Sequence, residues 1–160
     1  MAKNLLANNK LNLAGVDHIQ AGIFDINGIM RGKRLPTSSY SKIVKNGIQL
    51  PLSVQNIDIY GSDIENSKFV FATGDNDGTA TCQGAPQVFL RHLSKPVLLM
   101  PLGLRTGNGE LFEGCPRSFL KKVVNRAHAK NFVFKFGVEL EFYLFSENLF
   151  SPILSEPELL

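Results

Sequence analysis

The sequence predicts an α+β protein built from short strands and two helices. Two observations carry this prediction. Several short segments alternate apolar and polar residues, as half-buried strands do, and two others place apolar residues at helical spacing. The predicted order is a hairpin, a helix, short strands, a second helix and one long strand. A helix and a single strand cannot bury their own faces, so we expect the last elements to begin a second α/β unit.

A hairpin is the first predicted element. Residues 18–26 form the first arm, Asn27-Gly28 is a strong signal for a tight turn, and residues 29–35 supply the second arm. Residues 1–15 are polar and rich in asparagine, so we expect a poorly ordered or weakly helical lead-in there.

The first helix is predicted to begin at residues 36–39, whose Pro-Thr-Ser-Ser sequence suits a helix start, and to end at Gly47. Tyr40, Ile43 and Val44 would form its apolar face. The chain beyond it is less regular. We expect loops with a short strand at 57–60, further strands at 69–73, 87–93 and 96–101, a loop at 74–78 and a turn at 106–109.

A second helix and a long strand are the last regular elements predicted. Pro116 suits the first position of a helix, and the apolar stripe that follows comprises Phe119, Leu120, Val123, Val124 and Ala127. From Phe132 to Leu144 every even-numbered residue is apolar, which is typical of a strand with one buried face. Residues 146–160 show no clear period, and we expect an irregular tail.

Two carboxylates, Glu139 and Glu141, lie within this apolar strand. As i and i+2 neighbours they share the face opposite the apolar row, roughly 6.5–7 Å apart along the chain. Like charges side by side repel each other, and a divalent cation such as Mg²⁺ or Mn²⁺ would account for both. The alternative is a strand with a solvated outer face, on which glutamate is ordinary. Spacing alone leaves both interpretations open.

Composition excludes several functional classes. A net charge of +3, from 17 basic and 14 acidic residues, favours neither nucleic acid nor a membrane surface as partner. No apolar run approaches the roughly 20 residues that span a bilayer, and the first residues lack the apolar segment of a signal peptide. Cys82 and Cys115 do not form a Cys-x-x-Cys motif. We therefore expect reduced thiols and a cytoplasmic protein.

Other candidate motifs favour structural roles. The basic residues Arg31, Lys33 and Arg34 lack interleaved aromatic residues, so a solvated hairpin arm or a subunit contact is favoured over a nucleic-acid site. Residues 75–78 resemble part of a calcium loop without its closing carboxylate, which favours a turn. His18, His92 and His128 lack the pairing of a helical metal site, and Cys115 lacks a neighbouring histidine that would make it a nucleophile.

Five segments taken together resemble the glutamine synthetase family, and most closely its γ-glutamylpolyamine synthetase-like branch. They are residues 24–36, 47–53, 74–78, 115–117 and 138–145. The resemblance implies a β-grasp N-terminal domain at residues 16–103 and the start of a catalytic α/β domain at residues 104–145. It also implies a homo-oligomer with active sites between subunits.

The chemistry that the resemblance implies is ligation. Family members use ATP to join ammonia or an amine to the γ-carboxylate of glutamate through a γ-glutamyl phosphate, and divalent cations hold the phosphates. In the family both carboxylates of this strand bind metal, so Glu139 and Glu141 are expected to be ligands of Mg²⁺ or Mn²⁺. The ATP-binding segments and the remaining ligands follow this strand in the family, so no catalytic or ATP-binding residue is assigned here.

One departure from the family concerns the amine. The ammonia-using branch has Asp-Gly-Ser where this chain has Leu50-Pro-Leu-Ser53, and no acidic residue lies between Gly47 and Ile57. The aspartate that helps to bind ammonium in that branch has no counterpart, which favours a larger amine.

Three functional hypotheses follow. The first is the N-terminal portion of a glutamine synthetase-like ligase, cut short and inactive as an isolated chain. The second is a non-catalytic β-grasp module that docks on full-length ligase subunits. The third is a small metal-binding protein that uses Glu139 and Glu141.

Overall fold

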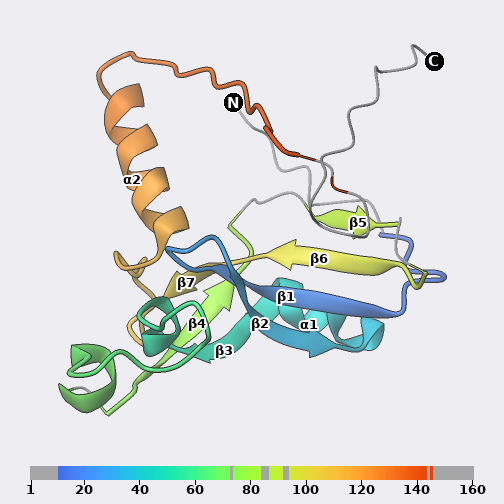
Figure 1. The fold of residues 1–160 in the computed structure, drawn as a ribbon, viewed down its shortest axis with the longest axis horizontal. Helices are drawn as coiled ribbons and strands as arrows, with labels where there is room; N and C mark the ends of the chain where they lie inside the picture. Colours follow the sequence, from blue (N-terminus) through green and yellow to red (C-terminus); the bar gives the residue numbers. More distant parts are fainter. Residues whose placement is uncertain (1–10, 73, 84–86, 92–93, 144, 146–160) are drawn as a thin grey trace. The chain divides into compact units, whose positions relative to one another are not determined.

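The computed structural model describes residues 11–72, 74–83, 87–91, 94–143 and 145. The chain divides into two compact units, Met1–Arg126 and Ala127–Leu160. The strands found in the described residues all belong to the first unit, whereas helix α2, Pro116–His128, begins in the first unit and ends in the second (Figure 1). Within the described ranges no helix combines the length and apolarity needed to cross a bilayer.

The larger sheet of the first unit has the strand order β2-β1-β6-β5. Its strands are β1 (His18–Phe24), β2 (Met30–Leu35), β5 (Val88–Leu90) and β6 (Val97–Pro101). β1 pairs with β2 as an antiparallel hairpin and with β6 in parallel, and β5 pairs with β6 in antiparallel fashion. β1 therefore lies inside the sheet, and β2 forms one edge.

The smaller sheet is antiparallel, in the order β3-β4-β7, with β3 at Ile48–Pro51, β4 at Asp77–Thr81 and β7 at Gly103–Arg105. A backbone hydrogen bond of 2.7 Å, from the N–H of Leu102 to the carbonyl oxygen of Gly22, links the segment before β7 to β1. The two sheets are thus joined within one unit.

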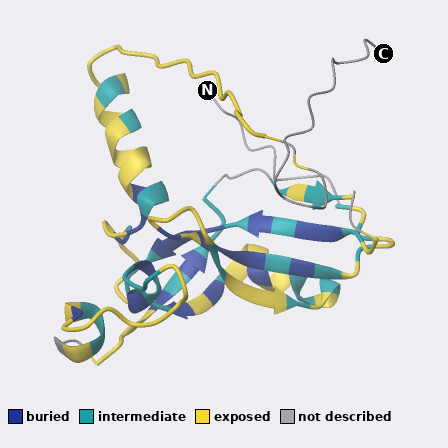
Figure 2. Cartoon of the chain, viewed as in Figure 1, coloured by how far each residue is buried: buried dark blue, intermediate teal, exposed yellow. Residues whose placement is uncertain are grey.

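A single hydrophobic core joins both sheets to the helix α1. Its buried side chains come from β1, β6, β3, β4, β7, α1 and the segment before α2, and they appear dark blue in Figure 2. They are Ile19, Ala21, Ile23, Ile43, Ile48, Leu50, Ala80, Leu98, Met100, Leu102, Leu104, Phe112 and Cys115. The mixture of helix and sheet around this core agrees with the predicted α+β class.

The predicted hairpin is confirmed. Along β1 the residues Ile19, Ala21 and Ile23 are completely buried, which is the alternation that the sequence shows. Gly28 adopts a φ of 77°, which glycine reaches without steric cost, and the N–H of Asp25 donates to the carbonyl oxygen of Ile29 at 3.0 Å to close the turn.

The predicted first helix is also confirmed. A 3₁₀ turn, η1 (Thr37–Ser39), leads into α1 (Tyr40–Asn46), and Gly47 ends the helix with a φ of 72°. The side chain of Ser39 makes no capping hydrogen bond, so Pro36 and the turn, rather than a side-chain cap, begin the helix. Ile43 anchors α1 in the core.

The chain between residues 48 and 83 differs from the prediction. Strands β3 and β4 were not expected, and neither was β7 further along. The expected strand at 57–60 is a turn closed by a bridge between Ile57 and Asp63, and the segment expected as a strand from residue 69 is instead the helical turn η3 (Lys68–Ala72). Short strands containing glycine or proline form here because tertiary pairing, rather than local propensity, selects them.

The ends of the described chain also differ from the prediction. Leu11, Leu13 and Val16 pack against the core, so residues 11–16 are not a loose lead-in. Of the strand expected at residues 132–145, the described residues 132–143 contradict the prediction, because they pair with no strand and carry exposed side chains. An extended segment becomes a strand only when a neighbour satisfies its backbone groups. The predicted tail at 146–160 lies outside the described residues.

Candidate functional site

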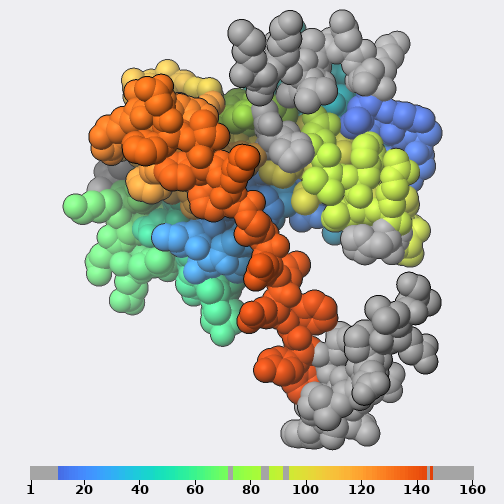
Figure 3. Space-filling model, turned by 90° about the horizontal axis from the view of Figure 1, so that it is seen from above, coloured from blue at the N-terminus to red at the C-terminus, as the bar shows by residue number. Residues whose placement is uncertain are grey.

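The predicted metal ligands Glu139 and Glu141 lie in the second unit, in an exposed stretch of chain that forms no helix or strand. Figure 3 shows this stretch in orange to red. The apolar row that was expected to be buried is also exposed: the exposed fraction is 86% for Val138 and 83% for Leu140. The predicted buried face is therefore absent from the described part of this unit.

The two carboxylates are nevertheless suited to a hard cation. Neither forms an ion pair or a hydrogen bond within the described part of the chain, so their oxygens are available. Among the described residues no group of three acidic, histidine or cysteine side chains gathers in one place. Mg²⁺ commonly takes one or two protein carboxylates and completes its shell with water and substrate phosphates. The pair fits that role as part of a larger site.

The basic segment of β2 has a structural role at Arg31. Its Nε donates to Oδ2 of Asp25 at 2.9 Å, and the Asp25 side chain is only 1% exposed. The other carboxylate oxygen, Oδ1, accepts the N–H groups of Asn27 and Ile29, each at 2.9 Å. Burial alone would raise the pKa of Asp25, but the hydrogen bonds from Arg31, Ile29 and Asn27 outweigh it and hold that pKa below its ordinary value.

Arg31 also connects the hairpin to a second turn of the same design. Oδ1 of Asp58 accepts the N–H groups of Tyr60 and Ser62 at 2.8 and 2.9 Å, as Asp25 does in its own turn. Nη2 of Arg31 donates to the carbonyl oxygen of Asp58 at 2.9 Å. The guanidinium of Arg31 therefore links the two turns that begin at Asp25 and Asp58. This structural role accounts for a basic residue at this position, so a nucleic-acid site is not needed to explain it.

The Leu50–Ser53 segment, where the sequence departs from the resembled family, is part of the fold. Leu50 lies in β3 and is 5% exposed, and Ser53 and Gln55 in the 3₁₀ turn η2 (Leu52–Gln55) are also buried. Within the described residues the Oε1 atom of Gln55 is buried without a hydrogen-bond partner, while its Nε2 donates weakly, at 3.5 Å, to the carbonyl oxygen of Phe24. This segment therefore buries aliphatic, hydroxyl and amide groups and contains no carboxylate.

The remaining sequence candidates do not form a site in the described residues. His18 forms a hydrogen bond of 2.8 Å with the side chain of the adjacent Asp17. Asp77, from the segment that resembles a calcium loop, is the first residue of β4. Cys115 is completely buried, Cys82 has a pKa raised by burial, and both thiols are free. His92 lies outside the described residues.

Comparison with known proteins decides the family. A family model described as glutamine synthetase, catalytic domain, matches residues 113–157, a range that includes both carboxylates. Type-1 glutamine synthetase 2 of Dictyostelium discoideum is 31% identical over 143 residues, which cover 88% of this chain. Gamma-glutamylputrescine synthetase of Escherichia coli is 30% identical over 134 residues, 79% of this chain. The chain belongs to the glutamine synthetase family.

Within the glutamine synthetase family, this chain corresponds to part of the longer proteins. It spans 27% of the length of each of these two relatives. A third relative, gamma-glutamylanilide synthase from Acinetobacter, is 24% identical over 147 residues and is matched over 29% of its length. Two of these three relatives are named for a γ-glutamyl product of an amine larger than ammonia.

Solved structures show the same fold. A glutamine synthase homologue matches 77% of this chain with a TM-score of 0.63 and 19% identity, and the match covers 29% of that structure. The Plasmodium falciparum glutamine synthetase matches 76% of this chain with a TM-score of 0.53 and 18% identity, over 21% of its own chain.

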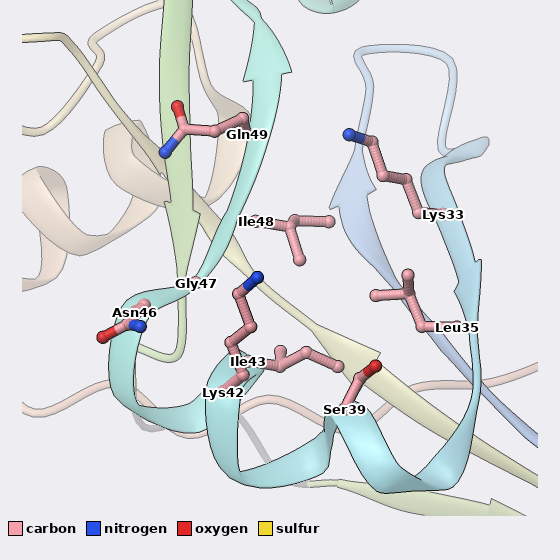
Figure 4. Close-up of a pocket in the computed structure, with 9 residues that line it drawn as sticks. All are labelled: Lys33, Leu35, Ser39, Lys42, Ile43, Asn46, Gly47, Ile48 and Gln49. Atoms are coloured by element: carbon pink, nitrogen blue, oxygen red, sulfur yellow. The ribbon is translucent and has the colours of Figure 1, made fainter.

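In this glutamine synthetase family member the structure also forms a pocket that the sequence did not predict. It lies between β2, α1 and β3, and Lys33, Leu35, Lys42, Ile43 and Ile48 are among its lining residues (Figure 4). Its two lysines, Lys33 and Lys42, are exposed and come from different elements, β2 and α1, so the packing of α1 beside the sheets brings them to one pocket. No local motif could have indicated it.

Proposed function

We propose that this chain is the N-terminal part of an ATP-dependent ligase that joins an amine to the γ-carboxylate of glutamate through a γ-glutamyl phosphate. The observation that carries the proposal is the match of the glutamine synthetase catalytic domain to residues 113–157. Under this proposal the first unit supplies a β-grasp-like N-terminal domain, bounded near residues 16–103. Residues 104–145 begin the catalytic domain of a cytoplasmic homo-oligomer.

Glu139 and Glu141 are proposed as ligands of two divalent cations, Mg²⁺ or Mn²⁺. The cations would neutralise phosphate charge during transfer of the γ-phosphoryl group of ATP. The contribution of this chain is two exposed carboxylates at i and i+2, with oxygens that no cationic side chain occupies in the described residues. The alternating pattern around them supports a strand in the assembled enzyme, where a neighbouring strand would satisfy its backbone groups and a packed layer would cover Val138 and Leu140.

The amine is proposed to be larger than ammonia. The segment Leu50–Ser53 lacks the carboxylate that would hold an ammonium ion, and Leu50 is directed into the core. The names of two relatives, a putrescine and an anilide ligase, agree with this proposal.

A chimera tests the proposed function directly. Residues 16–145 of this chain would replace the matching segment of the E. coli relative, and ATP- and glutamate-dependent phosphate release would be measured with putrescine and with ammonia. We expect turnover with putrescine to exceed turnover with ammonia. Glu139→Gln and Glu141→Gln should each lower kcat/KM by at least about 100-fold, because a lost metal ligand costs more than a lost supporting contact.

Glu65→Gln is the matched control, since Glu65 is an exposed glutamate of the first unit. It should leave kcat/KM within about twofold. A folded chimera in which Glu139→Gln behaves like Glu65→Gln would exclude the metal role. The isolated 160-residue chain is expected to show no turnover above background, and γ-glutamyl amide formation by that chain alone would contradict its proposed incompleteness.

A second candidate function is a non-catalytic module that docks on full-length ligase subunits. It is favoured by the exposed apolar residues of α2, where Phe119 and Leu120 are 60% and 61% exposed. Co-purification of this chain with a full-length relative, lost in Phe119→Ser but retained in Lys121→Ser, would support docking through this helix. A monomer in the same mixture would contradict it.

A further inference from the structure

The pocket beside α1 combines an apolar floor with a basic rim. Its volume is about 310 Å³, at the lower end of the range for small-molecule sites. Leu35 from β2, Ile43 from α1 and Ile48 from β3 form the floor (Figure 4). Lys33 and Lys42 rise on opposite sides of this floor, and Ser39 adds a hydroxyl group.

The charges around this pocket are of one sign. None of the nine lining residues is acidic, and within the described part of the chain neither Lys33 nor Lys42 forms an ion pair. Two ammonium groups that share a concave site without a counter-charge favour an anion, since field lines concentrate between walls of low dielectric constant. The amide of Gln49, by contrast, is engaged with the hydroxyl of Thr79 at 3.1 Å.

The floor decides which kind of anion fits. Ile43 and Ile48 are already buried beneath the pocket, whereas Leu35 is only partly buried. Inorganic phosphate would meet the lysines but would leave the exposed part of Leu35 in contact with water. An aliphatic chain would cover it, at roughly 25 cal/mol per Å² of apolar surface removed from water. A carboxylate on a short hydrocarbon chain satisfies both parts of the pocket.

We propose that this pocket binds a small aliphatic carboxylate, with its carboxylate between Lys33 and Lys42 and its hydrocarbon chain on the exposed part of Leu35. The pocket belongs wholly to the first unit. The site goes beyond the proposed ligase function and does not depend on it, because Glu139 and Glu141 lie in the other unit.

Hexanoate titrated into the full chain, followed by amide NMR, tests the site. We expect saturable shifts confined to residues around Lys33, Ser39 and Gly47, with a dissociation constant on the order of 1 mM. Lys33→Met and Lys42→Met keep the aliphatic stem and remove the charge, and each should weaken binding at least about fivefold. Raising the salt concentration to about 0.5 M should weaken binding several-fold.

Lys45→Met is the matched control, because Lys45 is exposed on the same helix but does not line the pocket. It should change the dissociation constant by less than about twofold. Any of three results would overturn the proposal. They are equal weakening by Lys42→Met and Lys45→Met, equally tight binding of neutral 1-hexanol, and binding of inorganic phosphate as tight as that of hexanoate.

Discussion

At the scale of single residues, the Asp25–Arg31 pair is the most heavily buried charge interaction described in the chain. Removing one partner of a buried pair leaves an uncompensated charge, whereas the intact pair itself stabilises little. We expect Arg31→Met to lower the free energy of unfolding by about 3 kcal/mol, measured by urea denaturation. Arg34→Met, an exposed change of the same kind on the same strand, should stay within about 0.5 kcal/mol. Equal effects of the two variants would contradict a buried pair.

The lowered pKa of Asp25 gives a second prediction at this scale. In the unfolded chain an aspartate has a pKa near 3.9, and the folded value is lower. The stabilisation is therefore complete above about pH 4 and is lost as the pH falls through the lower folded value. Asp17 and Glu113 also have lowered pKa values, through hydrogen bonds with His18 and Lys122.

Comparison of the wild-type chain with Asp25→Asn isolates the contribution of Asp25, because the other two carboxylates are unchanged. The difference in unfolding free energy should be constant between about pH 5 and pH 7 and should shrink toward pH 2. The measurement is a set of urea titrations at several pH values. A difference in unfolding free energy that grows as the pH falls would contradict a lowered pKa of Asp25 in the folded chain.

At the scale of elements, the β1–β2 hairpin depends on two glycines facing each other. Gly22 pairs with Gly32 in the strand register, and a Cβ on Gly32 would overlap the carbonyl oxygen of Ala21. Because that obstacle is backbone, the strands would have to separate. Gly32→Ala should lower the unfolding free energy by about 2 kcal/mol. Gly107→Ala is the control, since its Cβ would meet no atom within 4 Å, and a loss of similar size there would refute the steric argument.

The same elements show why parts of the fold could be predicted. The hairpin and α1 carry local signals, the alternation of Ile19, Ala21 and Ile23 and the stop at Gly47, and the structure confirms both. Strands β3 and β4 carry no such local signal. Pro51 in β3 and Gly78 in β4 are poor strand residues, and these strands form only because each has a partner strand to pair with. For residues 132–143 the alternation is clear, yet the described chain offers no strand to pair with it. Alternation indicates which face would be buried, but a strand also needs a neighbour.

At the scale of the whole molecule, the two candidate sites differ in how far the sequence predicts them. The carboxylates Glu139 and Glu141 were found from sequence because their spacing and surroundings are local. Their role as metal ligands remains a prediction, because the described chain brings no third ligand to them. The pocket of Lys33 and Lys42 was missed because it exists only after β2 and α1 pack together. Local chemistry can be predicted from the sequence, whereas a pocket between separate elements appears only in the fold.

The division into two units predicts where the chain is cut by protease. Lys130 and Lys135 are exposed and lie beyond the last residue of α2, in chain that forms no sheet or helix in the described residues. Proteases cleave such segments first, while the core around β1 and β6 opens only with global unfolding. Brief trypsin treatment should therefore release a stable fragment that ends at Lys130 or Lys135, identified by mass spectrometry. The Lys130→Gln, Lys135→Gln double variant should lose this early cut, whereas first cleavage within β2 or α1 would show that the first unit is not an independent core.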